Sequence, residues 1–425
     1  MPVRRTTFQQ TGNGASRYHR AMQHSPLNTF ERHIYLRRHL AHRTQALCAA
    51  ALCLAIASHA VRAAEPVQIS MTADRWTTVL GNVDFVEHMG KPSIELKAGD
   101  YKKGIRSGLA SLKDLQFANG TIEYDVSAES GMGAAFIFRA ASKDTFEMFY
   151  LRPQPNCPEA PDCVQYAPQT HGVLLWDLFP QYQGPAPLRT GQWNHVKLVI
   201  SGKRMDIYIN SATQPTLKIG RLEGDTAQGG VMLAGPGFFA GLTVEPDVVD
   251  GLSPDPEPDE TASDNCYLRR WQISPFSKLA EGQAPTYTDL PGASAKWAPI
   301  DAERGGLINA SRIYGLPVQR PERALVWLKT TIHSGSAQQK HASLGWAREV
   351  FVFVNGQTVY ADKNLYQPPA ARKPPDGRLS LENGSLILPL RAGDNEVAVA
   401  VASNFYGWGI KMRLDDINDV LLTRP

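Results

Sequence analysis

Residues 117–244 contain five short runs with the residue pattern of β-strands. They are FANGTIEYDV (117–126), GAAFIFRA (133–140), TFEMFYLRP (145–153), GQWNHVKLVISGKRMDIYIN (191–210) and GGVMLAG (229–235). In the fourth run, apolar residues alternate with other residues from Val196 to Ile200. The chain then turns at Ser201-Gly202-Lys203, and the alternation resumes from Met205 to Ile209. This pattern predicts an antiparallel hairpin with one buried face. Repeated strands without a helical period predict a β-sandwich.

Strand patterns return in the last third of the chain. They occupy 324–334, 349–360 and 385–403, and the second of these contains Asn355-Gly356 between two apolar runs. Asn-Gly in that position is a strong signal for a β-hairpin. We therefore predict an all-β protein with two β-sandwich (jelly-roll) domains.

An acidic, proline-rich segment separates the two sets of strands. Residues 245–265 read EPDVVDGLSPDPEPDETASDN and contain few large apolar side chains, which is typical of a stiff, solvated linker. The alternative is an ordered loop packed on one domain. The expected domains are a first sandwich over 64–244 and a second over 266–425.

The first 63 residues predict a signal peptide. They contain nine arginines and one acidic residue, Glu31, followed by an apolar run over 46–57 and by Val61-Arg62-Ala63. The apolar run is too short for a permanent membrane span. We therefore expect a periplasmic or secreted protein with no integral membrane segment after removal of this leader.

The charge of the chain depends on that leader. Without residues 1–63 the basic residues fall from 44 to 35 and the acidic residues from 41 to 40, so the net charge changes from +3 to −5. A mildly acidic protein without a basic stripe argues against nucleic acid and anionic membranes as partners.

The cysteines and histidines point to a disulfide and to no metal. Cys157 and Cys163 flank the short loop PEAPD, so in an oxidising compartment we expect them to form a local disulfide. Cys266 is then left as an incidental thiol. The five histidines beyond residue 63 lack metal-type spacing and the chain has no Cys-x-x-Cys, so we expect neither metal nor cofactor.

A segment rich in glycine, proline and aromatic residues is the candidate binding site. Aromatic rings can stack on sugar rings while nearby polar groups bind hydroxyls. The candidate stacking residues are Tyr166, Trp176 and Tyr182. The candidate polar residues are Arg152, Gln165 and Asp177. In the alternative interpretation, Trp176 and Tyr166 plug the edge of the sandwich and Arg152 pairs with an acid.

The quoted strands of residues 65–244 resemble the concanavalin A-like lectin and glucanase superfamily, particularly its laminin-G-like branch and the 3-keto-disaccharide hydrolase domain. VFVNGQTVY (352–360), LPLRAGDNEVAVAV (388–401) and GWGIKMRL (407–414) resemble galactose-binding-like jelly rolls. Both resemblances imply glycan biology outside the cytoplasm. The laminarinase-type pattern Glu-x-Asp-x-x-Glu is incomplete, because Glu123 and Asp125 have no third carboxylate after them.

We therefore expect an exported carbohydrate-binding protein, with an oligo- or polysaccharide as its partner and no catalytic centre of its own. One alternative is a glycoside hydrolase or lyase that uses acids among Asp177, Glu147 and Glu123. The other is a structural module that binds a protein partner, for which a flat, groove-free first sandwich with a buried Trp176 would be the sign.

Overall fold

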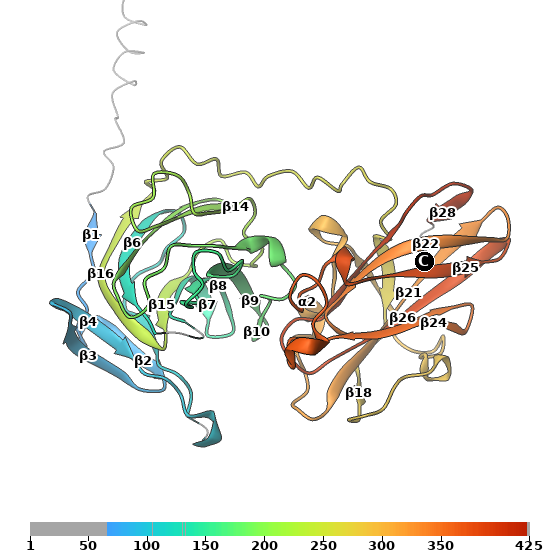
Figure 1. Ribbon diagram of the computed structural model, residues 1–425, viewed down its shortest axis with the longest axis horizontal. Coiled ribbons are helices and arrows are strands. Elements are labelled where there is room, and N and C mark those ends of the chain that lie inside the picture. Colours follow the sequence, from blue (N-terminus) through green and yellow to red (C-terminus); the bar gives the residue numbers. More distant parts are fainter. Residues whose placement is uncertain (1–65, 104, 130, 132, 423–425) are drawn as a thin grey trace, which may run out of the picture. The chain divides into compact units, whose positions relative to one another are not determined.

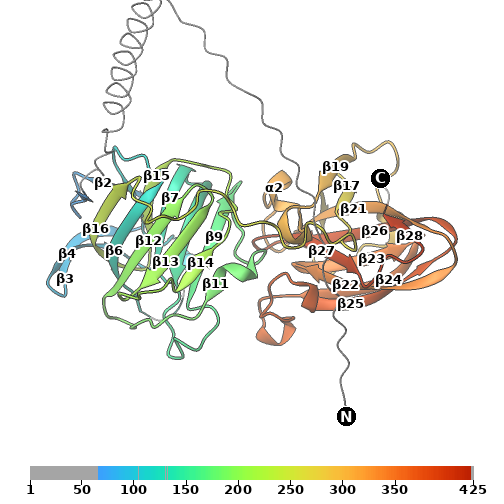
Figure 2. The same cartoon turned by 90° about the horizontal axis from the view of Figure 1, so that it is seen from above.

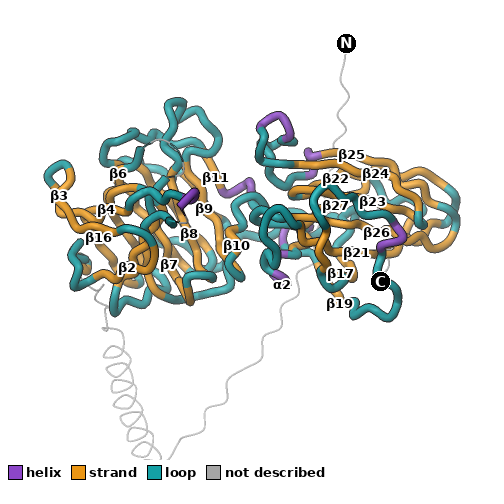
Figure 3. The backbone as a smooth tube through the Cα atoms, turned by 90° about the horizontal axis from the view of Figure 1, so that it is seen from below, coloured by secondary structure: helices purple, strands orange, loops and turns teal. Residues whose placement is uncertain are grey.

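The computed structural model describes residues 66–103, 105–129, 131 and 133–422, all within one compact unit, Ala63–Pro425. The signal peptide predicted over 1–63 lies outside the described residues. Strands dominate (Figure 3), and the only α-helix within the described ranges is α2, Ser311–Tyr314. The remaining helical turns are 3₁₀: η1 (Tyr101–Lys103), η2 (Pro180–Tyr182), η3 (Tyr287–Asp289), η4 (Arg304–Gly306), η5 (Pro369–Ala371) and η6 (Leu381–Asn383). No described helix is long and apolar enough to cross a membrane.

Two antiparallel sheets form the first sandwich (Figure 1). Sheet 1 has the order β14 (Leu217–Ile219), β13 (Arg204–Ile209), β12 (Asn194–Ser201), β6 (Gly120–Ser127), β16 (Gly237–Pro246), β4 (Lys91–Leu96) and β3 (Val83–His88), with β1 (Val67–Gln68) paired to β16. Sheet 2 has the order β10 (Val173–Leu174), β9 (Val164–Thr170), β8 (Thr145–Leu151), β7 (Ala135–Ser142), β15 (Gly230–Ala234), β5 (Leu109–Leu112) and β2 (Trp76–Leu80), with β11 (Gln183–Gly184) paired to β9.

The hairpin predicted from residues 196–209 is confirmed as β12 and β13, which lie side by side next to β6 (Figure 2). Leu198 pairs with Ile207 and Ile200 pairs with Met205, and all four side chains are buried in the core between the two sheets. Because strand residues alternate between faces, the intervening residues point away from this core. The alternation seen in the sequence therefore fixes which face of sheet 1 is buried.

Two further sheets form the second sandwich. Sheet 3 has the order β19 (Ala298–Asp301), β17 (Arg270–Ile273), β21 (Arg323–Ser334), β26 (Gly393–Ser403), β23 (Arg348–Val354) and β24 (Gln357–Asn364), with β18 (Ser277–Leu279) and β28 (Val420–Leu422) paired to β21. Sheet 4 has the order β20 (Ile308–Asn309), β27 (Gly409–Leu414), β22 (Gln338–Trp346) and β25 (Gly384–Leu390). The all-β prediction with two sandwiches is thus confirmed.

Turn chemistry places the strands of the second sandwich. β23 and β24 meet at Asn355 and Gly356, whose φ angles are 49° and 84°, as a hairpin turn of this kind requires. β25 and β26 are also consecutive in the chain, but they belong to different sheets. At the corner between them, the buried Asn395 amide donates to the carbonyls of Arg391 and Gly393 at 2.8 and 3.0 Å.

The segment between the sandwiches, residues 247–269, contains neither strand nor helix and is mostly exposed. It is nevertheless hydrogen-bonded along its length. Lys203 N–H donates to the carbonyl of Pro254 at 2.8 Å, and the carboxylate of Asp264 accepts from Arg413 Nε at 2.8 Å. The segment therefore makes specific contacts with both sandwiches, while the domain boundaries at 245 and 265 stay predictions.

Truncation of one core side chain tests this account of the first sandwich. Leu198→Ala removes a fully buried side chain, so we expect a loss of about 3 kcal/mol in the free energy of unfolding, measured with urea. Lys218→Ala, on the exposed side of β14, is the control and should change the free energy of unfolding by less than about 0.5 kcal/mol. Equal effects of the two substitutions would contradict the assigned faces.

Candidate functional site

The face of sheet 2 that points away from the core carries a second apolar cluster. It includes Ile137 of β7, Met148 and Tyr150 of β8, and Trp176, which follows β10. Three aromatic residues of the second sandwich pack against this cluster: Tyr366, Phe405 and Tyr406. The outer face of sheet 2 is therefore a contact surface between the two sandwiches.

A buried ion pair joins the sandwiches at the same place. Arg348 Nη2 donates to Asp177 Oδ2, and the two side chains are 4% and 0% exposed. The other oxygen of Asp177 accepts from Gly407 N–H at 3.1 Å, and the Asp177 carbonyl accepts from Leu379 N–H at 2.8 Å. Burial raises the pKa of Asp177 to about 6, while Arg348 and the Gly407 N–H lower it. Asp177 thus binds three elements of the second sandwich.

Trp176 anchors the contact from the first sandwich. Its ring makes edge contacts with Tyr366 and Tyr406, at centroid distances of 4.8 and 5.6 Å. Guanidinium groups lie within 6.0 Å of its ring centroid, in the range of cation–π attraction. They belong to Arg152 (5.8 Å), Arg348 (6.0 Å) and Arg378 (5.2 Å).

Beside Trp176 lies a cavity of about 660 Å³, which we call the aromatic cavity. Five aromatic rings line it: Tyr150, Trp176, Tyr366, Phe405 and Tyr406. Ser107, Arg152, Gln154 and Asp162 supply polar groups. The second-sandwich rings are half-buried, whereas Tyr150 and Trp176 keep only 7% and 5% of their surface exposed. A ligand in the cavity would therefore meet mainly the rings of the second sandwich.

Hydrogen bonds connect three of the predicted site residues, of which Arg152 and Trp176 line this cavity. Arg152 Nη2 donates to the hydroxyl of Tyr150 at 2.7 Å, and that hydroxyl donates to Gln165 Oε1 at 2.7 Å. Gln165 Nε2 in turn donates to the carbonyl of Trp176 at 2.7 Å. Gln165 is fully buried, and both the oxygen and the nitrogen of its amide are hydrogen-bonded. Among these hydrogen-bonded residues, Arg152 therefore has the polar atoms that are nearest to solvent.

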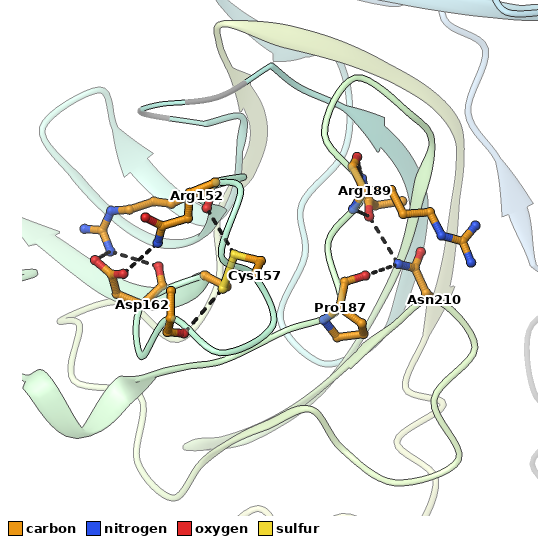
Figure 4. The surroundings of a disulfide bond; sticks show 10 residues. Arg152, Cys157, Asp162, Pro187, Arg189 and Asn210 are labelled. Atoms are coloured by element: carbon orange, nitrogen blue, oxygen red, sulfur yellow. Dashed lines mark hydrogen bonds and ion pairs between the residues drawn. A yellow bond between two sulfur atoms is a disulfide. The ribbon is translucent and has the colours of Figure 1, made fainter.

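The loop after β8 holds the polar side of the cavity in place (Figure 4). Cys157 and Cys163 form the disulfide that the sequence predicts. Asp162, one residue before Cys163, accepts from Gln154 Nε2 at 2.9 Å and lies 3.6 Å from Arg152 Nη1. It also contacts Arg378 Nη2 at 3.2 Å, so this loop too is tied to the second sandwich. Cys266 is a free thiol.

The prediction that Tyr166 and Tyr182 stack on a sugar is wrong. They are 0% and 5% exposed and lie in the core of the first sandwich. The Tyr166 hydroxyl donates to Glu147 Oε2 at 2.6 Å, and the Tyr182 hydroxyl donates to Glu223 Oε1 at 2.8 Å. Since Gln165 and Tyr166 are neighbours on β9, they point to opposite faces of sheet 2. Only one of them could have faced the cavity.

Three further expectations need correction. Gln165 does not offer its amide to a ligand, because the side chain is fully buried and bonded to Tyr150 and Trp176. Asp177 does not present its carboxylate to a ligand, because the carboxylate is fully buried against Arg348 and Gly407. Trp176 lines the cavity but serves mainly as the contact between the sandwiches. The alternative interpretation is correct for Tyr166, which is a core residue, and for Arg152, which pairs with Asp162.

The sequence prediction missed Tyr150 and the aromatic residues of the second sandwich. Tyr150 was open to detection, since it pairs with Gln165 across β8 and β9 and shares its face. Tyr366, Phe405 and Tyr406 carry no such signal, because the packing of one sandwich on the other brings them to Trp176. Tyr406 has a φ of 56°, which is rare for an aromatic residue and found most often where the surrounding packing holds it.

The three carboxyl groups considered for catalysis occupy separate places. Asp177 is buried against the second sandwich, and Glu147 is buried in the core beside Tyr166. Glu123 lies on the outer face of sheet 1, 3.2 Å from His195 Nε2, whose Nδ1 lies 3.0 Å from Asp125. Hydrogen bonding to Asp125, opposed by burial, raises the pKa of His195. No two of the three considered carboxyls face one another.

Glu147 should make stability pH-dependent. Burial raises its pKa to about 7, opposed by the Tyr166 hydrogen bond, so the folded protein holds a proton that the unfolded chain releases near pH 4.5. The contribution of Glu147 to the free energy of unfolding is fully present below about pH 4.5 and is lost as the pH rises through about 7. The glutamine of Glu147→Gln stays neutral at every pH. The free energy of unfolding of this variant, relative to that of the unchanged protein, should therefore rise by about 3 kcal/mol by pH 8. Urea unfolding measures this difference, and an equal difference between the two proteins at pH 5 and pH 8 would contradict the prediction.

The ion pair between the sandwiches should show strong coupling. Arg348→Met leaves Asp177 buried without its cation, and we expect a loss of about 3 kcal/mol in unfolding free energy at pH 8. Asp177→Asn combined with Arg348→Met leaves no charge and should recover part of that loss. Urea unfolding of both single variants and the double variant measures the coupling. Additive losses would mean that the pair does not act as a unit.

No protein-family model and no curated protein matches the chain. Among solved structures, it is similar to a carbohydrate-binding module from Bacillus subtilis, at 16% identity over 39% of this chain and 90% of that one, with a TM-score of 0.29. A β-glucanase from Bacillus licheniformis is 11% identical over 43% and 99%, with a TM-score of 0.32. A galectin-like protein of unknown function from Bacillus subtilis is 13% identical over 43% and 97%, also with a TM-score of 0.32. These are likenesses of fold at low identity. The galactose-binding-like character of residues 266–425 stays a prediction.

Proposed function

We propose that the protein binds a glycan in the aromatic cavity and does so without chemistry of its own. The observation that carries this proposal is the lining of the cavity, where five aromatic rings surround a few polar groups. Pyranose rings have apolar faces that pack on aromatic rings, and their hydroxyls need donors and acceptors at the edge. A volume of about 660 Å³ is in the range of ligand sites.

The distribution of carboxyl groups supports binding rather than cleavage. Cleavage of a glycosidic bond normally uses two carboxyl groups on either side of the bond. Among the described residues that line the cavity, only Asp162 carries a carboxyl group, and it is bonded to Gln154 and Arg378. Asp162 and Arg152 are therefore suited to bind hydroxyls rather than to transfer protons.

The disulfide supports an extracytoplasmic location. Disulfides such as Cys157–Cys163 form and persist in oxidising compartments. Together with the signal peptide predicted over residues 1–63, this favours a periplasmic or secreted protein that meets glycans outside the cytoplasm.

Removal of one ring tests the site. Tyr366→Ala deletes a half-buried ring that lines the cavity, and we expect about tenfold weaker binding of glycans that bind the unchanged protein. Calorimetric titration against a panel of oligo- and polysaccharides, with an assay for released sugar, provides the measurement.

Tyr208→Ala is the matched control, because this tyrosine is also half-buried but lies on sheet 1, away from the cavity. It should leave affinity unchanged. No binding to any member of the panel, or equal affinity for the two variants, would contradict the proposed site. Release of sugar would contradict the absence of catalysis.

A further inference from the structure

A second pocket shares two lining residues with the aromatic cavity. It has a volume of about 390 Å³, and its lining includes Tyr366 and Phe405, which also line the aromatic cavity. The rest of its lining comes from the second sandwich, including the start of β23 and the end of β24. A chain of sugar units could therefore extend from one into the other past these two rings.

This basic pocket carries an excess of positive charge. Its lining contains four cationic side chains, Arg320, Arg323, Arg348 and Lys363, against two carboxylates, Glu281 and Glu349. Glu349 is shared between Arg323 at 2.6 Å and Lys363 at 3.6 Å, and Arg348 is paired with the buried Asp177. Positive charge in a recess with low-dielectric walls concentrates anions.

Arg320 is the cation that is open to a ligand. It is exposed, and within the described part of the chain no carboxylate lies in ion-pair distance of it. Its guanidinium lies 4.3 Å from the ring centroid of Phe405, so the aromatic ring holds the group in position without using its N–H donors on a partner acid. A planar guanidinium with free donors is suited to a carboxylate or a sulfate.

A second arginine makes an anion favourable here. Arg348 lies 4.7 Å from the same Phe405 centroid, so two guanidinium groups share one ring. Burial lowers the pKa of Arg348, the charge of Asp177 opposes this, and repulsion from Arg320 lowers the pKa further. A bound anion would offset the repulsion between the two cations.

We propose that the ligand is an acidic glycan, with a carboxylate or sulfate in the basic pocket beside Arg320 and Lys363 and a neighbouring sugar ring in the aromatic cavity. This inference rests on the proposed function and adds the chemical class of the ligand. The exposed Lys363 lines the same pocket from β24, and its ion pair with Glu349 is long at 3.6 Å, so its ammonium group is available to the anion.

Paired probes that differ only in charge test the inference. Oligogalacturonate is compared with its methyl ester, and dextran sulfate with dextran, by calorimetric titration of the purified protein at low and high salt. We expect the charged member of at least one pair to bind about tenfold more tightly at low salt, as one charge-assisted contact implies. High salt should reduce this preference. The pair that shows it distinguishes carboxylate from sulfate.

Arg320→Gln should remove most of the charge preference, so that the charged and the neutral member of each pair then bind with similar affinity. Arg391→Gln, at an exposed arginine outside both pockets, should keep the preference and controls for general attraction of anions. If neutral glycans bind and charge brings no advantage, or if both variants respond alike, the acidic-ligand inference is overturned while the proposed function stands. If neither charged nor neutral glycans bind, both are overturned.

Discussion

The buried pair of Asp177 and Arg348 is the interaction on which the rest of the site depends. The two residues are 171 positions apart and come from different sandwiches, and both are almost completely removed from solvent. Removing a charge from water is costly unless its partner and hydrogen bonds are in place. The Asp177 carboxylate has both, because it accepts from Arg348 Nη2 and from the Gly407 N–H. The pair forms only when the second sandwich lies against sheet 2, so it specifies the contact that forms the cavity walls.

Arginine–aromatic contacts then make those walls rigid. Arg152 lies over Tyr150 at 4.7 Å, Arg372 over Tyr366 at 4.1 Å, and Arg320 over Phe405 at 4.3 Å from the ring centroids. A ring held by a cation on one side keeps its orientation before a ligand arrives, which reduces the entropy lost on binding. The same arrangement brings positive charge close to the cavity of a protein whose chain beyond residue 63 is acidic overall. The proposed stacking and the proposed anion binding thus use one set of side chains.

The fold could be predicted from the sequence because its signals are local. The alternation over 196–209 and Asn355-Gly356 each specify a hairpin without reference to the other half of the chain. The site could be predicted only in part. Arg152, Gln165 and Trp176 come together because they belong to neighbouring strands and loops of one sheet. The sequence does not place Tyr166 and Tyr182 at the ligand, because strand alternation puts Tyr166 on the face opposite Gln165 and both tyrosines lie in the core. Tyr366, Phe405 and Tyr406 depend on packing between sandwiches, for which the sequence carries no pattern.

Hydrogen–deuterium exchange of the purified protein, with and without a bound glycan, tests whether both sandwiches build the site. We expect slower exchange on binding in two places that are distant in sequence, the end of β8 with Tyr150 and the loop with Phe405 and Tyr406. Protection confined to one sandwich, or found on the outer face of sheet 1 around β6 and β12, would contradict a site built by both sandwiches.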